Sequence, residues 1–180
     1  MSGGRLGLTI GVGWSAAEYA ALGQDFHTRG ERLDEALDIF DAVWHEAPVA
    51  HDGEHYRFEP LRVLPQPAHD IPLWFGGSSA RALARATARG DGYQAISTPP
   101  AHLAPVVRAL RAERPGDDFT VSYRTGWDPQ GMEHGLILDE LAAYTEAGVQ
   151  HVVSAPWRTS GDDWIRSMEI LADLVQPEPD

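Results

Sequence analysis

The stretch PLWFGGSSARALARATARGDGY, residues 72–93, decides the fold. Its first apolar residues predict a buried strand that ends in glycines, and alanine-rich periodicity predicts a helix over 79–89. Gly90 is placed to end that helix, Asp91 and Gly92 to form a turn, and Tyr93 to enter the next strand. A strand, a helix and a second strand in this order imply parallel strands joined by a right-handed crossover.

The same alternation continues on both sides of this stretch. Further strands are expected near residues 6–12, 119–125 and 149–157, and further helices near 28–46, 103–110, 133–147 and 165–175. Gly148 lies at the C′ position of the helix expected over 133–147. Residues 48–70 interrupt the rhythm, and we interpret them as an inserted hairpin and loop, with HDGEH as its turn. About five parallel strands in a single domain over 1–180 fit either a doubly wound sheet or part of a (β/α)₈ barrel. A complete barrel typically takes about 250 residues and eight such units.

Composition narrows the possible partners. Fourteen cationic side chains, all arginine, face 27 acidic ones, and the formal net charge of −13 argues against nucleic acid or an anionic membrane as partner. The chain has no cysteine, which excludes disulfides and thiolate chemistry. Its apolar runs are too short to span a bilayer, so a cytoplasmic location is the expectation.

Four motifs carry a resemblance. They are GRLGLTIGVGW (4–14), DFHTRGERLDEAL (25–37), GEHYRF (53–58) and the opening stretch. In this order and spacing they resemble the luciferase-like monooxygenase superfamily, especially its branch that depends on the deazaflavin coenzyme F420. The resemblance implies a partial TIM (β/α)₈ barrel from about the fourth strand onward. MSGGRL then looks like an internal segment, and we hypothesise a truncated or split barrel lacking the first three βα units.

GGSS follows a predicted strand and precedes a predicted helix, an arrangement that favours anion binding. Glycines allow close approach to the backbone, serines offer hydroxyls, and the helix start supplies free N–H groups. The resemblance implies that Gly76, Gly77, Ser78 and Ser79 hold the coenzyme phosphate. A turn with a serine N-cap is the plainer interpretation.

GVGW lies at the carboxyl end of the first predicted strand. The resemblance places Gly11, Gly13 and Trp14 against the deazaflavin or flavin ring. The alternative is a tight turn with a tryptophan packed on the following helix.

The sequence signals for substrate contacts are less specific than those for the coenzyme. Three residues at or near strand ends are candidates to line a substrate cleft, or else packing and rim residues: Tyr123, Arg124 and Trp157.

The histidines do not predict a metal site. His51 and His55 are four residues apart, but they flank a predicted turn and so do not share a helix face. The DFHTRGERLDE motif is interpreted as a helix start held by side-chain pairs. No catalytic acid or base is carried over from the family.

The resemblance implies an oxidoreductase that transfers a hydride between F420 and an organic substrate. An FMN-dependent monooxygenase is the enzymatic alternative, and a non-catalytic cofactor-binding or assembly subunit is another. Five parallel strands would leave two unpaired edges. We therefore expect a homo-oligomer, or a partner chain that supplies the missing strands.

Overall fold

The computed structural model describes residues 3–175, which form two compact units. The hairpin unit comprises residues 3–6 and 11–71, and the sheet unit comprises residues 7–10 and 72–175. Met1 and Ser2, the first residues of the segment interpreted as internal to a barrel, lie outside the described residues.

The sheet unit is built on five parallel strands in the order β1-β4-β5-β6-β7. These strands are β1 (Leu8–Ile10), β4 (Leu73–Gly76), β5 (Gly92–Ile96), β6 (Thr120–Thr125) and β7 (His151–Ser154). The helices that connect or follow them are α3 (Ala80–Arg89), α4 (Pro100–Glu113), α5 (His134–Glu146) and α6 (Gly161–Val175). The prediction of an α/β fold with five parallel strands is confirmed. Strand β1 is shorter than the predicted 6–12.

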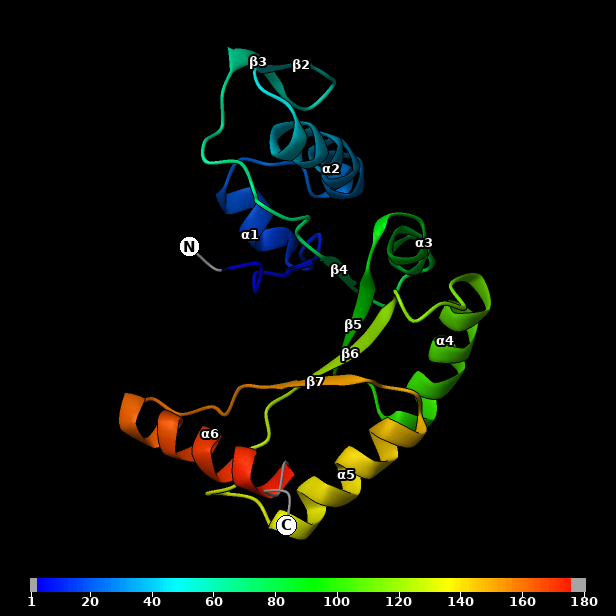
Figure 1. Ribbon diagram of the computed structural model, residues 1–180, viewed down its shortest axis with the longest axis vertical. Helices are drawn as coiled ribbons and strands as arrows, with labels where there is room; N and C mark the ends of the chain where they lie inside the picture. Colours follow the sequence, from blue (N-terminus) through cyan, green and yellow to red (C-terminus); the bar gives the residue numbers. More distant parts are fainter. Residues whose placement is uncertain (1–2, 176–180) are drawn as a thin grey trace. The chain divides into compact units, whose positions relative to one another are not determined.

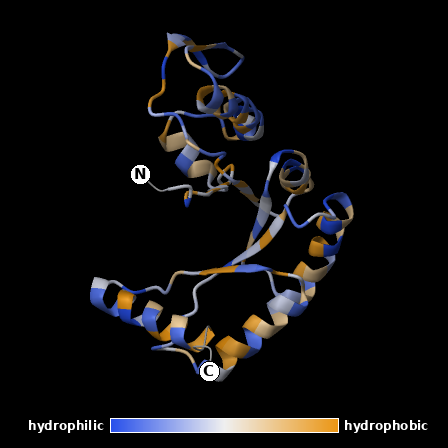
Figure 2. Ribbon diagram, in the orientation of Figure 1, coloured by the Kyte–Doolittle hydropathy of each residue, from blue (hydrophilic) through white to orange (hydrophobic). Residues whose placement is uncertain are grey.

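Helices cover one face of the sheet. Figure 1 shows α3 to α6 along one side of the curved sheet. Phe75, Tyr93 and Val121 are paired in register and are 0–3% exposed, so they form the core beneath these helices. Figure 2 shows apolar residues on β6, β7 and α5, where this core continues.

The hairpin unit contains the segment that interrupts the strand–helix rhythm. Its helices are α1 (Ala16–Ala21), η1 (Phe26–Thr28) and α2 (Arg29–His45), and its strands are β2 (Val49–Asp52) and β3 (Arg57–Leu61). The two strands pair antiparallel, as the predicted hairpin requires. Helix α1 is not among the predicted elements; it has six residues, below the length at which apolar periodicity is informative.

Glu35 joins helix α2 to this hairpin. Its carboxylate accepts hydrogen bonds from His51 Nε2 at 2.9 Å and from the backbone N–H groups of His55 at 2.8 Å and Tyr56 at 2.9 Å. A Cβ at Gly53 would collide with Glu35 Oε1, so glycine allows the turn to close over the carboxylate. Burial alone would raise the pKa of Glu35, but these hydrogen bonds and the charge of His51 lower it to about 2. The DFHTRGERLDE motif does start a helix, as interpreted, but its Glu35 binds the hairpin and does not pair within the helix start.

We expect Glu35→Gln to lower the thermal unfolding midpoint at pH 7, because each carboxylate oxygen accepts a hydrogen bond from a backbone N–H, and an amide NH₂ in place of either oxygen would face a donor. The folded-state pKa lies below the ordinary value of 4.5, so the carboxylate stabilises the fold above about pH 4.5 and loses this effect as the pH falls towards 2. Thermal unfolding of variant and wild type from pH 7 to pH 3 should show a difference that shrinks with acid. Glu54→Gln, at an exposed turn position, is the control. A constant difference across this range would contradict the assignment.

Gly148 ends helix α5 in the way the sequence predicts. Its N–H donates to Thr145 O and that of Val149 donates to Tyr144 O, the paired bonds of a Schellman motif. Gly148 has a φ of +94°, and a Cβ there would lie 2.9 Å from Val107 Cγ1 of α4. The glycine therefore permits both the helix end and the contact between two helical segments.

Gly148→Ala should reduce the free energy of unfolding by roughly 1–2 kcal/mol, the cost of a left-handed conformation for a residue with a Cβ. Displacement of Val107 adds to that cost. Gly135→Ala, within α5 and with open space around it, should be neutral or stabilising by up to about 1 kcal/mol. Urea denaturation measures both variants, and equal effects would contradict the assigned role of Gly148.

Candidate functional site

The GGSS segment forms the connection between β4 and α3. Gly77 has a φ of +110°, and a Cβ there would lie 3.1 Å from Ala82 Cβ. Ser79 is the N-cap of α3, and its Oγ accepts a hydrogen bond from Ala82 N at 3.2 Å. The side chain predicted to contact a phosphate therefore caps the helix, although its hydroxyl proton is still available to donate. Gly77 and Ser78 are exposed at the positive end of the helix dipole, which is suited to an anion.

Gly11, Gly13 and Trp14 follow the carboxyl end of β1 and belong to the hairpin unit. Gly13 has a φ of +76°, and the Tyr19 ring lies 3.2 Å from where its Cβ would be. Tyr19 Oη donates to Val12 O at 2.6 Å, so α1 supports this turn. Trp14 is 87% exposed, and its indole is available to a ligand.

The two substrate-contact candidates on β6, Tyr123 and Arg124, lie on opposite faces of the sheet. Tyr123 is 8% exposed and stacks on Tyr144 of α5, with ring centroids 3.9 Å apart. Burial, followed by the contact with Tyr123, raises the pKa of Tyr144, so Tyr144 is neutral, and the two rings pack between sheet and helix. Arg124 is exposed and, because side chains alternate along a strand, lies on the opposite face.

That opposite face carries a hydrogen-bonded row that the sequence analysis missed. Gln94 Nε2 donates to Ser122 Oγ at 3.3 Å, and Ser122 Oγ lies 3.0 Å from His151 Nδ1. The three residues are paired in register across β5, β6 and β7, and the Trp74 ring packs edge-on against His151. Polar residues inside strands were the available signal, because they interrupt apolar runs. The row offers His151 as a polar group for a ligand on this face.

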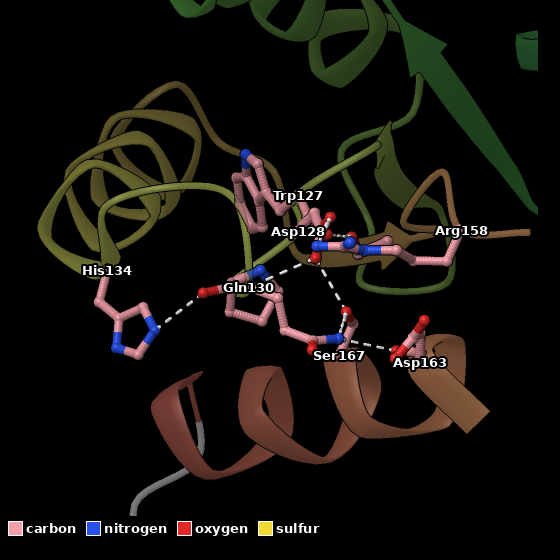
Figure 3. Close-up of polar contacts among 9 residues, drawn as sticks. Trp127, Asp128, Gln130, His134, Arg158, Asp163 and Ser167 are labelled. Atoms are coloured by element: carbon pink, nitrogen blue, oxygen red, sulfur yellow. Dashed lines mark hydrogen bonds and ion pairs between the residues drawn. The ribbon is translucent and has the colours of Figure 1, made fainter. Parts of the chain in front are cut away.

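The loops after β6 and β7 are joined by a polar cluster (Figure 3). Arg158 Nη2 lies 2.7 Å from Asp128 Oδ2, and Ser167 Oγ of α6 donates to Asp128 Oδ1 at 2.8 Å. Gln130 Nε2 donates to Ser167 Oγ at 2.6 Å and to Asp163 O at 2.8 Å. Burial would raise the pKa of Asp128, but hydrogen bonds from Ser167, Arg158 and the Gln130 backbone, together with the Arg158 charge, lower it. The ionised carboxylate therefore holds both loops in place.

This cluster positions Trp157, which precedes Arg158. Trp157 is 87% exposed, and its Nε1 lies 3.0 Å from where a Cβ of Gly126 would be. Glycine at 126 thus lets the indole lie against the backbone just beyond β6. Because the carboxyl ends of parallel strands meet at one edge, the GGSS loop, Arg124 and Trp157 all belong to the same end of the sheet.

Ser97 lies at this end too, directly after β5. It has a φ of +52°, the sole positive value among the described non-glycine residues. Thr98 Oγ1 donates to Ile96 O at 3.0 Å, and Tyr144 Oη donates to Thr98 O at 3.1 Å, so the neighbouring segment is held from two sides. Such strained positions cluster at functional sites.

A cavity of about 410 Å³ lies elsewhere, between β7, α5 and α6. Leu141, Met168 and Leu171 are among its lining residues, as is His151, and it contains none of the site residues predicted from the sequence. Within residues 3–175, no three His, Asp or Glu side chains are grouped to hold a metal ion. In the same range no helix is long and apolar enough to cross a membrane.

Comparisons with known proteins agree with this arrangement. The profile of the family described as luciferase-like monooxygenase matches residues 1–126. The pyrimidine monooxygenase RutA of Stutzerimonas stutzeri is 31% identical over 121 residues, which are 62% of this chain and 33% of that protein. The aligned part of the chain thus spans about a third of the length of that curated relative.

Solved structures share the fold at low identity. An F420-dependent secondary alcohol dehydrogenase has a TM-score of 0.75 at 15% identity, covering 97% of this chain and 71% of that one. The F420-dependent tetrahydromethanopterin reductase of Methanopyrus kandleri has a TM-score of 0.69 at 14% identity, covering 98% and 75%. With a family profile that matches more than two thirds of its residues, this chain belongs to the luciferase-like monooxygenase family.

Proposed function

We propose that this chain is the coenzyme-binding part of an oxidoreductase that transfers a hydride between coenzyme F420 and an organic substrate. The observation that carries the proposal is the GGSS connection, in which exposed Gly77 and Ser78 precede the N-terminus of α3. The coenzyme supplies the redox chemistry when bound. The sheet unit's own contribution is to hold a phosphate through backbone N–H groups and Ser78, and to offer the sheet face opposite α3 to α6 to the ring and substrate.

An FMN-dependent monooxygenase is the alternative, and the similarity to a pyrimidine monooxygenase favours it. Both coenzymes have a phosphate for the same loop to bind. That relative is about three times as long as the region aligned with this chain. Its activity is therefore also a proposal for this chain.

Thermal unfolding with each coenzyme tests the proposal. A ligand at about one hundred times its dissociation constant should stabilise the folded chain by roughly 2.7 kcal/mol, and the coenzyme that does so identifies the branch. Ser78→Asp should abolish this shift, because a carboxylate in the loop repels phosphate. It should not destabilise the free chain, since acidic residues are favourable near a helix N-terminus.

Ser160→Asp is the matched control, because it adds the same charge just before α6. We expect it to retain the shift. If only Ser160→Asp lost the coenzyme-induced stabilisation, the phosphate would be assigned to the start of α6, and the GGSS assignment would be overturned. If neither coenzyme changed the unfolding midpoint of the wild type, a non-catalytic subunit would be favoured.

We also propose that the sheet unit associates with another chain, either a second copy or one that supplies further strands. Strands β1 and β7 each have one paired neighbour in the described sheet. Several large apolar side chains of α5 and α6 are 40–55% exposed: Leu136, Leu138, Trp164 and Ile165. Unpaired edges and exposed apolar residues favour association.

Size-exclusion chromatography with light scattering should therefore give a mass of at least twice 19.7 kDa at micromolar concentration. Leu136→Ala and Ile165→Ala shorten two of these exposed apolar side chains, so each should shift the measured mass towards that of a single chain. A stable monomer that binds no hydrophobic dye would contradict this proposal.

A further inference from the structure

We propose that Arg124 binds the carboxylate of an aromatic or otherwise apolar organic acid, which is the substrate class of this site. The proposal rests on the proposed function, because it assumes that the substrate enters at the carboxyl end of the sheet. It is carried by the orientation of Arg124, by its apolar neighbours and by the absence of an acidic partner for it in the described part of the chain.

The register places Arg124 on the face opposite α3 to α6. It is paired with Ile96 of β5 and Val153 of β7, so these three side chains lie side by side on that face. Ile96 is 51% exposed, which is unusual for an isoleucine in a central strand and leaves apolar surface beside the guanidinium. A ligand here would meet a positive charge between two aliphatic side chains.

The charge of Arg124 is not neutralised by its surroundings. Within residues 3–175, the structure records no hydrogen bond or ion pair for its guanidinium, whereas Arg57, Arg114 and Arg158 each pair with an aspartate. This is notable in a chain with 27 acidic residues and a net charge of −13. A guanidinium has five N–H donors in a planar fork that matches a carboxylate. Arg124 can therefore use this fork for a ligand without breaking an existing bond.

The strand order leaves room for that ligand. Arg124 on β6 and Gly76 on β4 are on the same face, and alternate strands of such barrels contribute side chains to one layer. Gly76 has no side chain to fill this part of the layer, and a Cβ there would be in ordinary van der Waals contact with Gln94 O at 3.6 Å. Two strand spacings, about 10 Å, separate β4 from β6. The carboxylate site is thus distinct from the phosphate loop.

Trp157 supplies an aromatic surface beside this site. Its indole packs against Gly126, two residues beyond Arg124, and is 87% exposed. The Asp128–Arg158 ion pair holds the loop that carries it. A planar apolar group on the indole and aliphatic side chains, with its carboxylate on Arg124, would use every feature of this surface.

The test is a binding titration of benzoate, followed by ligand-observed NMR, with the full 180-residue chain. Benzamide, which is neutral and of the same shape, is the ligand control. Arg124→Gln removes the charge, and Arg108→Gln, at an exposed position on helix α4, is the matched protein control. Arg124→Lys keeps the charge but not the fork. Since Arg124 is exposed, all three variants should unfold at the wild-type midpoint.

We expect benzoate to bind the wild type and Arg108→Gln equally, and Arg124→Gln about tenfold or more weakly, the loss typical of a charged hydrogen bond. Arg124→Lys should be intermediate, and benzamide should bind none of them measurably. Equal benzoate binding by Arg124→Gln, or no binding by the folded wild type, would overturn the proposal.

A parallel titration with F420 and FMN separates the carboxylate from the coenzyme phosphate. Arg124→Gln should leave coenzyme affinity unchanged. A loss of coenzyme affinity without a loss of benzoate affinity would assign Arg124 to the phosphate and overturn the substrate role. If the wild type binds neither coenzyme but benzoate binding still depends on Arg124, the proposed oxidoreductase function fails while the organic-acid site stands.

Discussion

Parallel pairing of the strands is the constraint on which the rest of the sheet unit depends. Parallel neighbours require crossover helices, and α3 to α6 lie on one side of the sheet. Alternation along each strand then divides the residues: Tyr123 packs under α5, and Arg124, its neighbour in sequence, lies on the other face. Two adjacent candidates are thereby separated into a core residue and a residue available to ligand.

Local geometry explains why some elements were predictable from sequence. Gly90 and Gly148 follow α3 and α5 as predicted, because helix ends depend on residues within one turn. The hairpin was predictable for the same reason, since prolines and glycine limit the backbone there. Ser79 shows the limit of such reasoning: a serine before a helix fits both a cap and a phosphate ligand, and the structure shows its Oγ bound to Ala82 N.

Contacts between distant residues were not predictable in this way. Glu35 binds residues of the hairpin 16 to 21 positions away, and Ser122 and His151 are 29 residues apart. Neither pair has a spacing that a helix or turn would impose, so only strand register or packing brings them together. The Glu35 contact also accounts for two of the motifs that carry the family resemblance, because GERLDE supplies the carboxylate and GEHYRF the backbone donors. These motifs therefore maintain the hairpin's attachment to α2.

The acidity of the chain makes local geometry decisive for any anionic ligand. A net charge of −13 repels phosphates and carboxylates at long range, and this repulsion is screened within about a Debye length of 8–10 Å. Binding must then come from groups that contact the anion directly, such as the first N–H groups of α3 or the guanidinium of Arg124. A carboxylate such as Asp128 does not compete for Arg124, because Arg158 and Ser167 already satisfy it. Pairing of acidic groups close to the site is therefore consistent with an Arg124 that, among the described residues, has no acidic partner in a chain with almost twice as many acids as bases.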